Sequence, residues 1–576
     1  MAFEIKGDVA ADEIHKFEQL SQERKFLQGI GSLPHWYTTQ GWQMFSEKYS
    51  VEGESAVYGR HRQIARTLVK HLPMALWQEW EEKFFNILWK GILSPASPAL
   101  GNTGTDRGMM VSCAGQVVGN SVDDFYKSLH EMAMLSKHGF GTSADFSQIQ
   151  GRGTPFGDGG KANGAVEVIN DFFDAAKKIS QGGRRRGSVG AYLDADHPDF
   201  WEAITELKLD NNGKNYGWTI RDEFIERLKA GDEETKTRFK EMLYVKLLTG
   251  KGYLFFVDKA NRHRPEMYKK HGLKIIATNL CSEIMLHSSK DLTYSCILAS
   301  LNLIHWNEIK ETDAAFVAMV FLDCLCSEFI MKSEGKSGLE KVREFTIKGR
   351  AVGLGVMGLG TYFQQEMIPY ESLQAQFIDN EVFKHIHDET LRASKWLAEI
   401  LGEPEWCEGF GVRNTHRTAL APTKSTALLM GGVSESWFPD PGMIFDAGSA
   451  VGELRRITPE FYELMKRKGV YSTETIEDII NHMGSVQHVD WLTDEEKLVF
   501  KTAFEMDQRV IYRRARNRQK WLCQGQSLNF WFAEGAEELI SEIMTLCLLD
   551  EEILSVYYAY LRSGVVVTDE CIACAA

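Results

Sequence analysis

The segment Asn279-Leu280-Cys281-Ser282-Glu283 contains an amide, a thiol and a carboxylate at alternate positions. If the segment is extended, these three side chains point to the same side, because successive side chains of a strand alternate between its two faces. A hydrogen-bonding amide, a sulfur and a potential base would then surround one small volume. Taken alone, however, the segment favours a polar loop with an incidental cysteine.

Cys113 and Cys296 are the partners that we expect for Cys281. Cys296 follows Cys281 by 15 residues, and Cys113 lies far upstream. Two thiols that meet in space can deliver two electrons by closing a disulfide, whereas a third thiol can act as a radical or a nucleophile. The sequence alone does not show that the three thiols meet. Most of the ten cysteines are expected to be small buried hydrophobic residues.

The chain ends with Cys571-Ile-Ala-Cys574, a spacing that suits thiol–disulfide exchange. Residues 563–576 are small and polar without periodicity, which predicts a mobile tail. Cys571 lies 13 residues after Tyr558, so an extended tail reaches at most about 45 Å. A dithiol on such a tail could enter a cleft of its own subunit or of a neighbouring one. The alternative is a disordered tail with incidental thiols.

Two polar segments are candidates for phosphate binding. The loop Gly182-Gly-Arg-Arg-Arg-Gly187 offers three guanidinium groups between glycines, and Arg donates hydrogen bonds to phosphate in pairs. The segment Ala421-Pro-Thr-Lys-Ser-Thr-Ala427 begins a predicted helix with hydroxyl groups, a Lys and backbone N–H groups that attract phosphate. The alternatives are a solvated basic loop and ordinary helix capping by Thr423 or Ser425.

Two other motifs are ambiguous. Gly353-Leu-Gly-Val-Met-Gly358 matches the dinucleotide-binding pattern G-x-G-x-x-G, but no clear apolar strand precedes it. We therefore expect a closely packed glycine-rich turn there and no dinucleotide. Tyr557 and Tyr558 are adjacent, as packing or interface tyrosines often are. They could take part in one-electron oxidation only in a protein with radical chemistry.

The elements that would position these residues follow from hydrophobic periodicity. Residues 1–93 are predicted to be helical, and Leu93-Ser-Pro-Ala-Ser-Pro-Ala-Leu-Gly101 breaks the pattern and indicates a domain boundary. From there to about residue 550, helical and strand patterns alternate. Asp222–Gly231 is typical of a helix, and Tyr253–Val257 of a buried strand. The alternation predicts an α/β sheet or barrel.

Composition excludes several classes of function. The chain has 576 residues, a net charge of −15 and a pI near 5.6, so it is a poor candidate for coating nucleic acid. No apolar run approaches the roughly 20 residues that cross a bilayer, and the N-terminus does not resemble a signal peptide. We therefore expect a cytoplasmic protein with reduced thiols. Its single Cys-x-x-Cys is half of a four-thiolate zinc site, and we expect no metal in this chain.

Taken together, these segments resemble the large, catalytic subunit of ribonucleotide reductase, from about Leu93 to the C-terminus. Motifs of that family occur in the family's order: Ser94–Pro98, Val111–Cys113, Ser180–Gly187, Asn279–Glu283, Ser295–Leu303, Arg350–Leu359, Pro422–Thr426, Arg518–Gln519 and Gln526–Asn529. The resemblance implies a ten-stranded α/β barrel with a finger loop threaded through it. It divides the chain into a helical N-terminal region (1–93), a catalytic barrel (94–556) and a segment with radical-transfer tyrosines and a redox tail (557–576).

The resemblance also implies roles for the first group of residues. Cys281 would become a thiyl radical and take the 3′ hydrogen of the ribose. Glu283 would accept the proton of the 3′ hydroxyl, and Asn279 would hold the substrate. Cys113 and Cys296 would reduce the 2′ position as water leaves, and they would end as a disulfide.

Further residues are implied to regenerate the enzyme and to bind nucleotides. Cys571 and Cys574 would reduce the internal disulfide and be recycled by thioredoxin or glutaredoxin. The substrate phosphates would be held by Ser97, Ser112, Thr423, Lys424, Ser425 and Thr426. An effector site for dNTP or ATP, expected at a homodimer interface, would comprise Asn120, Ser121, Arg152, Gly183, Arg184, Arg185 and Arg186. Asn120 stands where the family often has an acidic residue.

The source of the radical stays open at this point. In class I enzymes a ferritin-like small subunit oxidises the catalytic cysteine through paired tyrosines, and Tyr557 and Tyr558 match that place, with Tyr557 nearer Cys281. In class II enzymes adenosylcobalamin does so within the same chain. We favour class I, and we disfavour the glycyl-radical class because no matching glycine motif is present. Whether diphosphates or triphosphates are reduced is also open. Outside the family, the alternative is a nucleotide-binding thiol–disulfide oxidoreductase.

About 93 residues precede the expected barrel, and they do not match the ATP-binding helical module with which many large subunits begin. We therefore expect a compact form with no overall-activity site and little inhibition by dATP. A small enzyme of this kind would suit a streamlined genome such as that of a phage, and it would act in the host cytoplasm.

Overall fold

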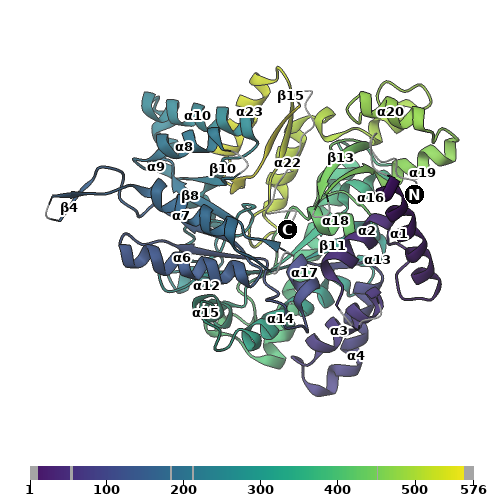
Figure 1. Cartoon of the computed structure of the whole chain (residues 1–576), viewed down its shortest axis with the longest axis horizontal. Coiled ribbons are helices and arrows are strands. Elements are labelled where there is room, and N and C mark those ends of the chain that lie inside the picture. Colours follow the sequence, from purple (N-terminus) through teal and green to yellow (C-terminus); the bar gives the residue numbers. More distant parts are fainter. Residues whose placement is uncertain are drawn as a thin grey trace.

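A computed structural model describes residues 11–51, 53, 56–157, 159–181, 185–210, 213–449 and 452–562. Strands at its centre are surrounded by helices (Figure 1). The N-terminal helices α1 (Ala11–Gly29), α2 (Thr39–Met44), α3 (Ala56–Val69) and α4 (Trp77–Trp89) lie on one side of these strands, and α5 (Ser97–Asn102) follows them. The buried guanidinium of Arg60 on α3 donates to the carbonyls of Leu100 and Thr103, which fixes α5 against α3.

Five parallel strands form one half of the barrel. Their order is β2 (Cys113–Val117), β3 (Gly141–Asp145), β8 (Val189–Asp194), β9 (Tyr216–Ile220) and β10 (Tyr253–Phe256). Nearly every residue in them is buried, as expected of parallel strands covered on both faces. The connecting helices are α6 (Val122–Lys137), α7 (Ala165–Lys178), α8 (Phe200–Leu209), α9 (Asp222–Lys229) and α10 (Glu233–Thr249). The predicted helix at 222–231 and strand at 253–257 are confirmed as α9 and β10.

The second half of the barrel closes the ring. β11 (Tyr294–Asn302) pairs antiparallel with β2 and parallel with β12 (Val352–Met357), and β16 (Ser555–Val556) pairs antiparallel with β10. Between β12 and β16 the pairing runs through two short segments: Leu354 bridges Thr418, Leu420 bridges Gln526, and the Tyr557 N–H donates to the Leu528 carbonyl at 2.8 Å. Within the described residues, eight strands and these two segments form a ring of ten. The expected α/β barrel is confirmed.

Further elements surround this ring. β1 (Leu93–Pro95) pairs antiparallel with the C-terminal part of β11, past the residues that pair with β2. β15 (Phe530–Ala533) pairs parallel with β17 (Ala559–Arg562). The β4–β5 hairpin (Pro155–Phe156, Gly160–Lys161) projects from the body in Figure 1. The other helices are α11 (Val257–His263), α12 (Glu266–Lys270), α13 (Trp306–Ile309), α14 (Ala314–Lys332), α15 (Glu340–Gly349), α16 (Leu359–Gln365), α17 (Leu373–Leu401), α18 (Lys424–Leu429), α22 (Gln508–Gln519) and α23 (Glu537–Leu549).

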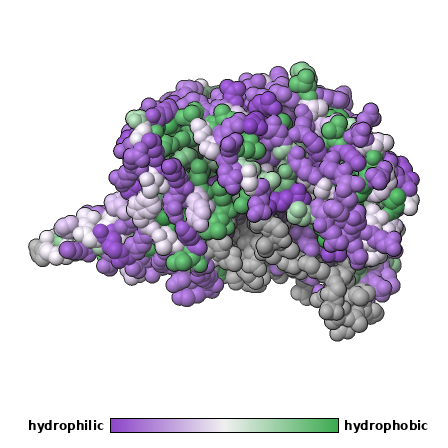
Figure 2. All heavy atoms as spheres, turned by 90° about the horizontal axis from the view of Figure 1, so that it is seen from above, coloured by the Kyte–Doolittle hydropathy of each residue, from purple (hydrophilic) through white to green (hydrophobic). Residues whose placement is uncertain are grey.

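A small unit with its own hydrophobic cluster follows α18. It contains the hairpin β13–β14 (Ile444–Ser449, Gly452–Ile457), α19 (Pro459–Lys468), α20 (Thr473–Asn481) and α21 (Asp494–Val499). Phe461, Ile479 and Phe500 are among its buried residues. The unit lies at the upper right of Figure 1, and hydrophilic residues cover most of the molecular face shown in Figure 2.

The expectation that no apolar run reaches membrane-spanning length is wrong for helix α14. Its 19 residues are long and apolar enough to cross a membrane, but 83% of its apolar 18-residue stretch is buried inside the protein. Phe316 and Phe321 contact Trp80 and Phe84 of α4, with ring centroids 6.3 Å and 5.5 Å apart. A helix that is apolar all round is a core helix when protein covers every side.

The expected glycine-rich turn at 353–358 is wrong, although the expectation of close packing is right. Residues 352–357 form the barrel strand β12. A Cβ on Gly353 would lie 2.4 Å from the Leu298 side chain, and one on Gly355 would lie 2.6 Å from the Ala419 carbonyl. These glycines allow the Thr418 segment to approach β12, so the G-x-G-x-x-G match reflects strand packing.

A buried charge cluster joins α14 to this half of the barrel. The fully buried carboxylate of Asp323 pairs with Arg350 at 2.8 Å and with Arg413 at 3.0 Å, and it accepts the Asn414 amide at 2.9 Å. Arg350 lies two residues before the start of β12, and Arg413 and Asn414 lead to the Thr418 segment. Burial alone would raise the pKa of Asp323, but the two guanidinium groups lower it to about 2.

We predict that Asp323→Asn destabilises the protein by about 3–5 kcal/mol, because it leaves the buried Arg350 and the partly buried Arg413 without their carboxylate partner. Since the pKa is depressed in the folded protein, the contribution of Asp323 is full above about pH 4 and is lost as the pH falls through about 2. Urea denaturation at pH 7 measures the loss. Asp388→Asn, which removes an exposed partner of Lys384, should cost less than about 1 kcal/mol. Equal costs for the two variants would contradict the assigned role.

Candidate active site

The finger segment between α12 and β11 passes through the barrel and makes a turn at Asn279–Ser282. The Ser282 N–H donates to the Asn279 carbonyl at 3.1 Å, and Ser282 has a φ of 65°. The extended conformation considered for residues 279–283 is therefore wrong. The Asn279 side chain determines the local geometry instead, because its Oδ1 accepts the N–H groups of Glu283 at 2.9 Å and Ile284 at 3.1 Å.

Barrel strands satisfy the remaining polar groups of the turn. The Tyr192 hydroxyl on β8 donates to the Asn279 carbonyl at 2.8 Å and lies 3.2 Å from Ser282 Oγ. Ser555 Oγ on β16 donates to the Ser282 carbonyl at 2.6 Å. These contacts come from both halves of the barrel, so the turn is bound to each half.

Cys113 and Cys296 lie opposite each other on neighbouring strands. They are register partners in the β2–β11 pair. The Asn279 amide lies 3.8 Å from Cys113 Sγ, which brings the pair next to the finger turn. Burial, and then the nearby Cys113 thiol and Glu283 carboxylate, raise the pKa of Cys296. The finger turn that carries Cys281 therefore lies beside the Cys113–Cys296 pair, and all three cysteines are thiols in this structure.

Glu283 is a buried carboxyl group at the same site. Its exposed fraction is 1%. Burial raises the pKa of Glu283 to about 7, although hydrogen bonds from the Asn279 amide and from Ser527 Oγ, the latter at 3.2 Å, favour the charged form. A carboxyl group with such a pKa can accept or donate a proton near neutral pH.

Tyr557 and Tyr558 connect the site to the end of the barrel. The Tyr557 hydroxyl donates to Cys281 Sγ at 3.6 Å. The rings of Tyr557 and Tyr558 have centroids 4.2 Å apart at an interplanar angle of 60°. Both residues directly follow β16, so the strand that closes the barrel also places the two phenols in a row behind the thiol.

Sequence reasoning missed two residues beside these phenols. The Tyr253 hydroxyl on β10 donates to the Tyr558 hydroxyl at 3.4 Å. The Lys246 ammonium on α10 donates to the Tyr557 carbonyl, and burial lowers the pKa of Lys246 to about 7. Both contacts join residues that are about three hundred positions apart in the chain. The buried strand pattern at 253–257 gave the position of Tyr253 but not its partner.

The proposed phosphate ligands lie on two sides of the site. Backbone hydrogen bonds from Ala96 to Leu298 and from Ser112 to Cys296 place Ser97 and Ser112 along β11. Ser97 Oγ lies 2.9 Å from the Tyr49 hydroxyl, and Ser112 Oγ is buried without a hydrogen-bond partner in the described part of the chain.

The second set starts α18 close to the tyrosines. Thr423 has a φ of 60°, and its Oγ1 accepts the Ser436 N–H at 2.8 Å, so it does not cap the helix as one alternative held. Lys424 Nζ lies 5.4 Å from the centroid of the Tyr558 ring, and Ser425 and Thr426 are buried. Hydroxyl groups and a Lys are thus present beside the tyrosines that lie behind Cys281.

The structure brings two of the proposed effector residues, Asn120 and Arg152, near each other. Asn120 Oδ1 accepts the Gln150 N–H at 3.0 Å, which brings Asn120 near Arg152. Ser121 caps α6, and Arg152 pairs with Glu167 and Glu202. Arg185 and Arg186 form β7, opposite β6 (Ser180–Gln181). Gly183 and Arg184, and Cys571 and Cys574 of the tail, lie outside the described residues.

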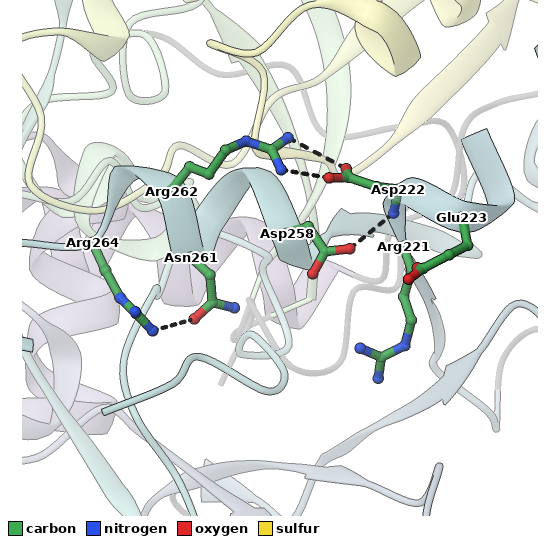
Figure 3. A pocket seen from close by; sticks show the side chains of 7 residues that line it. All are labelled: Arg221, Asp222, Glu223, Asp258, Asn261, Arg262 and Arg264. Atoms are coloured by element: carbon green, nitrogen blue, oxygen red, sulfur yellow. Dashed lines mark hydrogen bonds and ion pairs between the residues drawn. The ribbon is translucent and has the colours of Figure 1, made fainter. Parts of the chain in front are cut away.

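A polar pocket lies between α9 and α11 (Figure 3), and none of the residues that line it is a cysteine. It has a volume of about 470 Å³ and is lined by Arg221, Asp222, Glu223, Asp258, Asn261, Arg262 and Arg264. Arg262 pairs with Asp222 and Glu551, and Arg221 pairs with Asp194. Its opposite charges neutralise one another, and nothing there resembles the thiol site.

Comparisons with known proteins agree with this fold and geometry. The family model described as ribonucleotide reductase, barrel domain, matches residues 111–238, 233–410 and 404–550, and the all-alpha domain of the same enzyme matches residues 35–108. The chain belongs to the ribonucleotide reductase large-subunit family. It therefore acts in the reduction of ribonucleotides to deoxyribonucleotides.

Individual relatives come from viruses and cells. The protein assigned as the ribonucleoside-diphosphate reductase large subunit of Frog virus 3 is 32% identical, with 80% of this chain and 84% of the relative covered. The vitamin B12-dependent ribonucleoside-diphosphate reductase of Thermoplasma acidophilum is 31% identical, with 72% of this chain and 56% of the relative covered. Among solved structures, the class Id α subunit of Actinobacillus ureae has a TM-score of 0.83 and 35% identity, with 92% and 98% covered.

We predict that mild oxidation joins Cys113 to Cys296. Directly opposite Cβ atoms on paired strands are about 4.5–5.5 Å apart and a disulfide needs about 3.8 Å, so a shift of about 1 Å is enough. Non-reducing peptide mapping of a Cys571→Ser/Cys574→Ser variant would identify the bridge without exchange by the tail. Cys324 and Cys326, buried on α14, should remain thiols. A bridge that includes Cys281 would contradict the division of roles among the three thiols.

Proposed function

We propose that this chain is the catalytic subunit of a class I ribonucleotide reductase, in which a thiyl radical on Cys281 is generated through Tyr557 and Tyr558. A ferritin-like small subunit supplies the oxidising equivalent. The observation that supports this best is the 3.6 Å hydrogen bond from the Tyr557 hydroxyl to Cys281 Sγ, with the Tyr558 ring packed edge to face against that of Tyr557. No metal or cofactor is proposed within this chain.

The site residues divide the reaction among them. The Cys281 thiyl radical takes the 3′ hydrogen of the ribose, Glu283 accepts the proton of the 3′ hydroxyl, and the Asn279 amide orients the substrate. The 2′ hydroxyl leaves as water, and Cys113 and Cys296 supply two electrons and become a disulfide. The 3′ hydrogen then returns from Cys281, which regenerates the radical.

The remaining assignments complete the cycle. We propose that Cys571 and Cys574 reduce the Cys113–Cys296 disulfide and are recycled by thioredoxin or glutaredoxin. Substrate phosphates bind to Ser97, Ser112 and residues 423–426. A dNTP or ATP effector binds at residues 120–121, Arg152 and the loop 183–186 across a homodimer interface. The chain is divided into the helical region 1–93, the barrel 94–556 and the segment 557–576.

The comparisons support the finer points of this proposal to different degrees. The relatives named as ribonucleoside-diphosphate reductases favour a diphosphate substrate. The class Id α subunit favours a class I radical source. The vitamin B12-dependent relative supports the second candidate, in which adenosylcobalamin generates the radical without a partner subunit. Viral relatives favour a virus-encoded enzyme that acts in the cytoplasm of its host.

Cys281→Ser tests the radical assignment. We expect this variant to lose nucleotide reduction and to keep nucleotide binding, measured by calorimetry, because only the hydrogen-abstracting atom changes. Tyr557→Phe and Tyr558→Phe should also lose turnover in the presence of the small subunit. Retained reduction by Cys281→Ser would overturn the radical mechanism. Reduction with adenosylcobalamin alone, together with active tyrosine variants, would replace class I by class II.

The pH profile tests Glu283. A base must be deprotonated, and the pKa of Glu283 is about 7, so kcat should rise as the pH increases through about 7. Glu283→Gln should lower kcat by about 10²–10⁴-fold and remove this dependence. Ser527→Ala removes a hydrogen bond that favours the carboxylate, so its profile should shift to higher pH. A profile unchanged in Glu283→Gln would assign the base to another group.

A further inference from the structure

The row of aromatic side chains continues beyond Tyr558. Tyr560 lies on β17, and its ring stacks on that of Tyr558 with centroids 5.2 Å apart and an interplanar angle of 18°. The exposed fraction increases along the series, from 0% at Tyr557 to 2% at Tyr558 and 8% at Tyr560. Three phenols therefore lead from the buried sulfur of Cys281 toward the molecular surface.

Trp531 fixes the position of the third phenol. Trp531 and Tyr560 are register partners in the parallel pair β15–β17, and their rings stack with centroids 5.7 Å apart at 27°. Phe438 contacts Trp531 edge to face, with centroids 5.0 Å apart. Tyr560 thus contacts two aromatic rings on a hydrogen-bonded strand, and its ring plane is determined by its neighbours.

The hydroxyl group is what distinguishes Tyr560 from a phenylalanine in the same aromatic cluster. Phe would make the same ring contacts at position 560 without a phenol group that needs a polar partner. A phenol differs from Phe in that it can lose one electron and one proton to give a phenoxyl radical. Two stacked phenols of similar potential can exchange a radical between them, because electronic coupling is strongest between rings in contact.

We propose that Tyr560 is a third radical carrier, placed between Tyr558 and the radical-generating partner subunit. This inference rests on the proposed function, which assigns Tyr557 and Tyr558 to radical transfer. A one-electron oxidant on the partner takes one electron and one proton from Tyr560, and the O–H bond of Tyr560 breaks. The Tyr560 phenoxyl then takes one electron and one proton from Tyr558, and its own O–H bond forms again.

The same exchange moves inward until it reaches the thiol. Tyr558 takes an electron and a proton from Tyr557, and Tyr557 takes them from Cys281, whose S–H bond breaks. The net change is the passage of one electron and one proton from Cys281 to the oxidant of the partner. Each phenol ends in its starting state, so Tyr560 is a catalyst of the transfer and is not consumed.

Two measurements with the complete enzyme test this proposal. Tyr560→Phe keeps the stacked ring but removes the phenol, so kcat with the small subunit should fall by at least about tenfold, while KM and effector binding stay unchanged. In a second protein, 3-aminotyrosine replaces Tyr560. This analogue is oxidised more easily than tyrosine, so it should trap the radical, and electron paramagnetic resonance should show an aminotyrosyl signal after mixing with partner, substrate and effector.

Controls separate this inference from the function on which it rests. Tyr362→Phe removes another buried phenol, which donates to Asn307 at 3.3 Å, and it should leave kcat unchanged. If 3-aminotyrosine gives a signal at position 558 but not at 560, and Tyr560→Phe keeps wild-type kcat, Tyr560 is a packing residue and the inference is overturned. If Tyr557→Phe and Tyr558→Phe also keep wild-type kcat, the class I assignment itself is overturned.

Discussion

A polar turn buried inside the barrel is the constraint on which the rest of the structure depends. Backbone N–H and C=O groups removed from water must find partners, or each costs about 1–3 kcal/mol. In the finger turn the Asn279 side chain accepts two of these N–H groups, and Tyr192 and Ser555 donate to two carbonyls. Because those donors come from β8 and β16, the turn and the two halves of the barrel fix each other.

This arrangement also sets the chemistry of the site. The burial that requires every backbone group to be paired raises the pKa values of Glu283 and Cys296. A carboxyl group poised near neutrality and a protonated thiol are therefore consequences of one enclosed location. The same enclosure keeps Cys281 beside Tyr557 and away from bulk water, since both side chains are buried.

Local patterns in the sequence predicted a large part of this molecule. Hydrophobic periodicity identified the helix at 222–231, the strand at 253–257 and the α/β class, and the family resemblance gave Cys113, Cys281 and Cys296 their expected roles. Periodicity could not identify the Thr418 and Gln526 segments, because a single bridge leaves no repeating pattern. It also misassigned β12, whose glycines reflect the approach of Ala419 from another segment. The contacts of Tyr253 and Lys246 depend on pairing across about three hundred residues, which no local signal contains.

The position of β16 in the chain has a consequence for the timing of synthesis. This strand is short, it completes the ring, and the two tyrosines that lead to Cys281 follow it directly. During translation β16 emerges after every other barrel strand, so a partly made chain has an open barrel and no phenol behind its thiol. The hydrogen bond from Tyr557 to Cys281 can therefore form only when the enclosure around that thiol is complete.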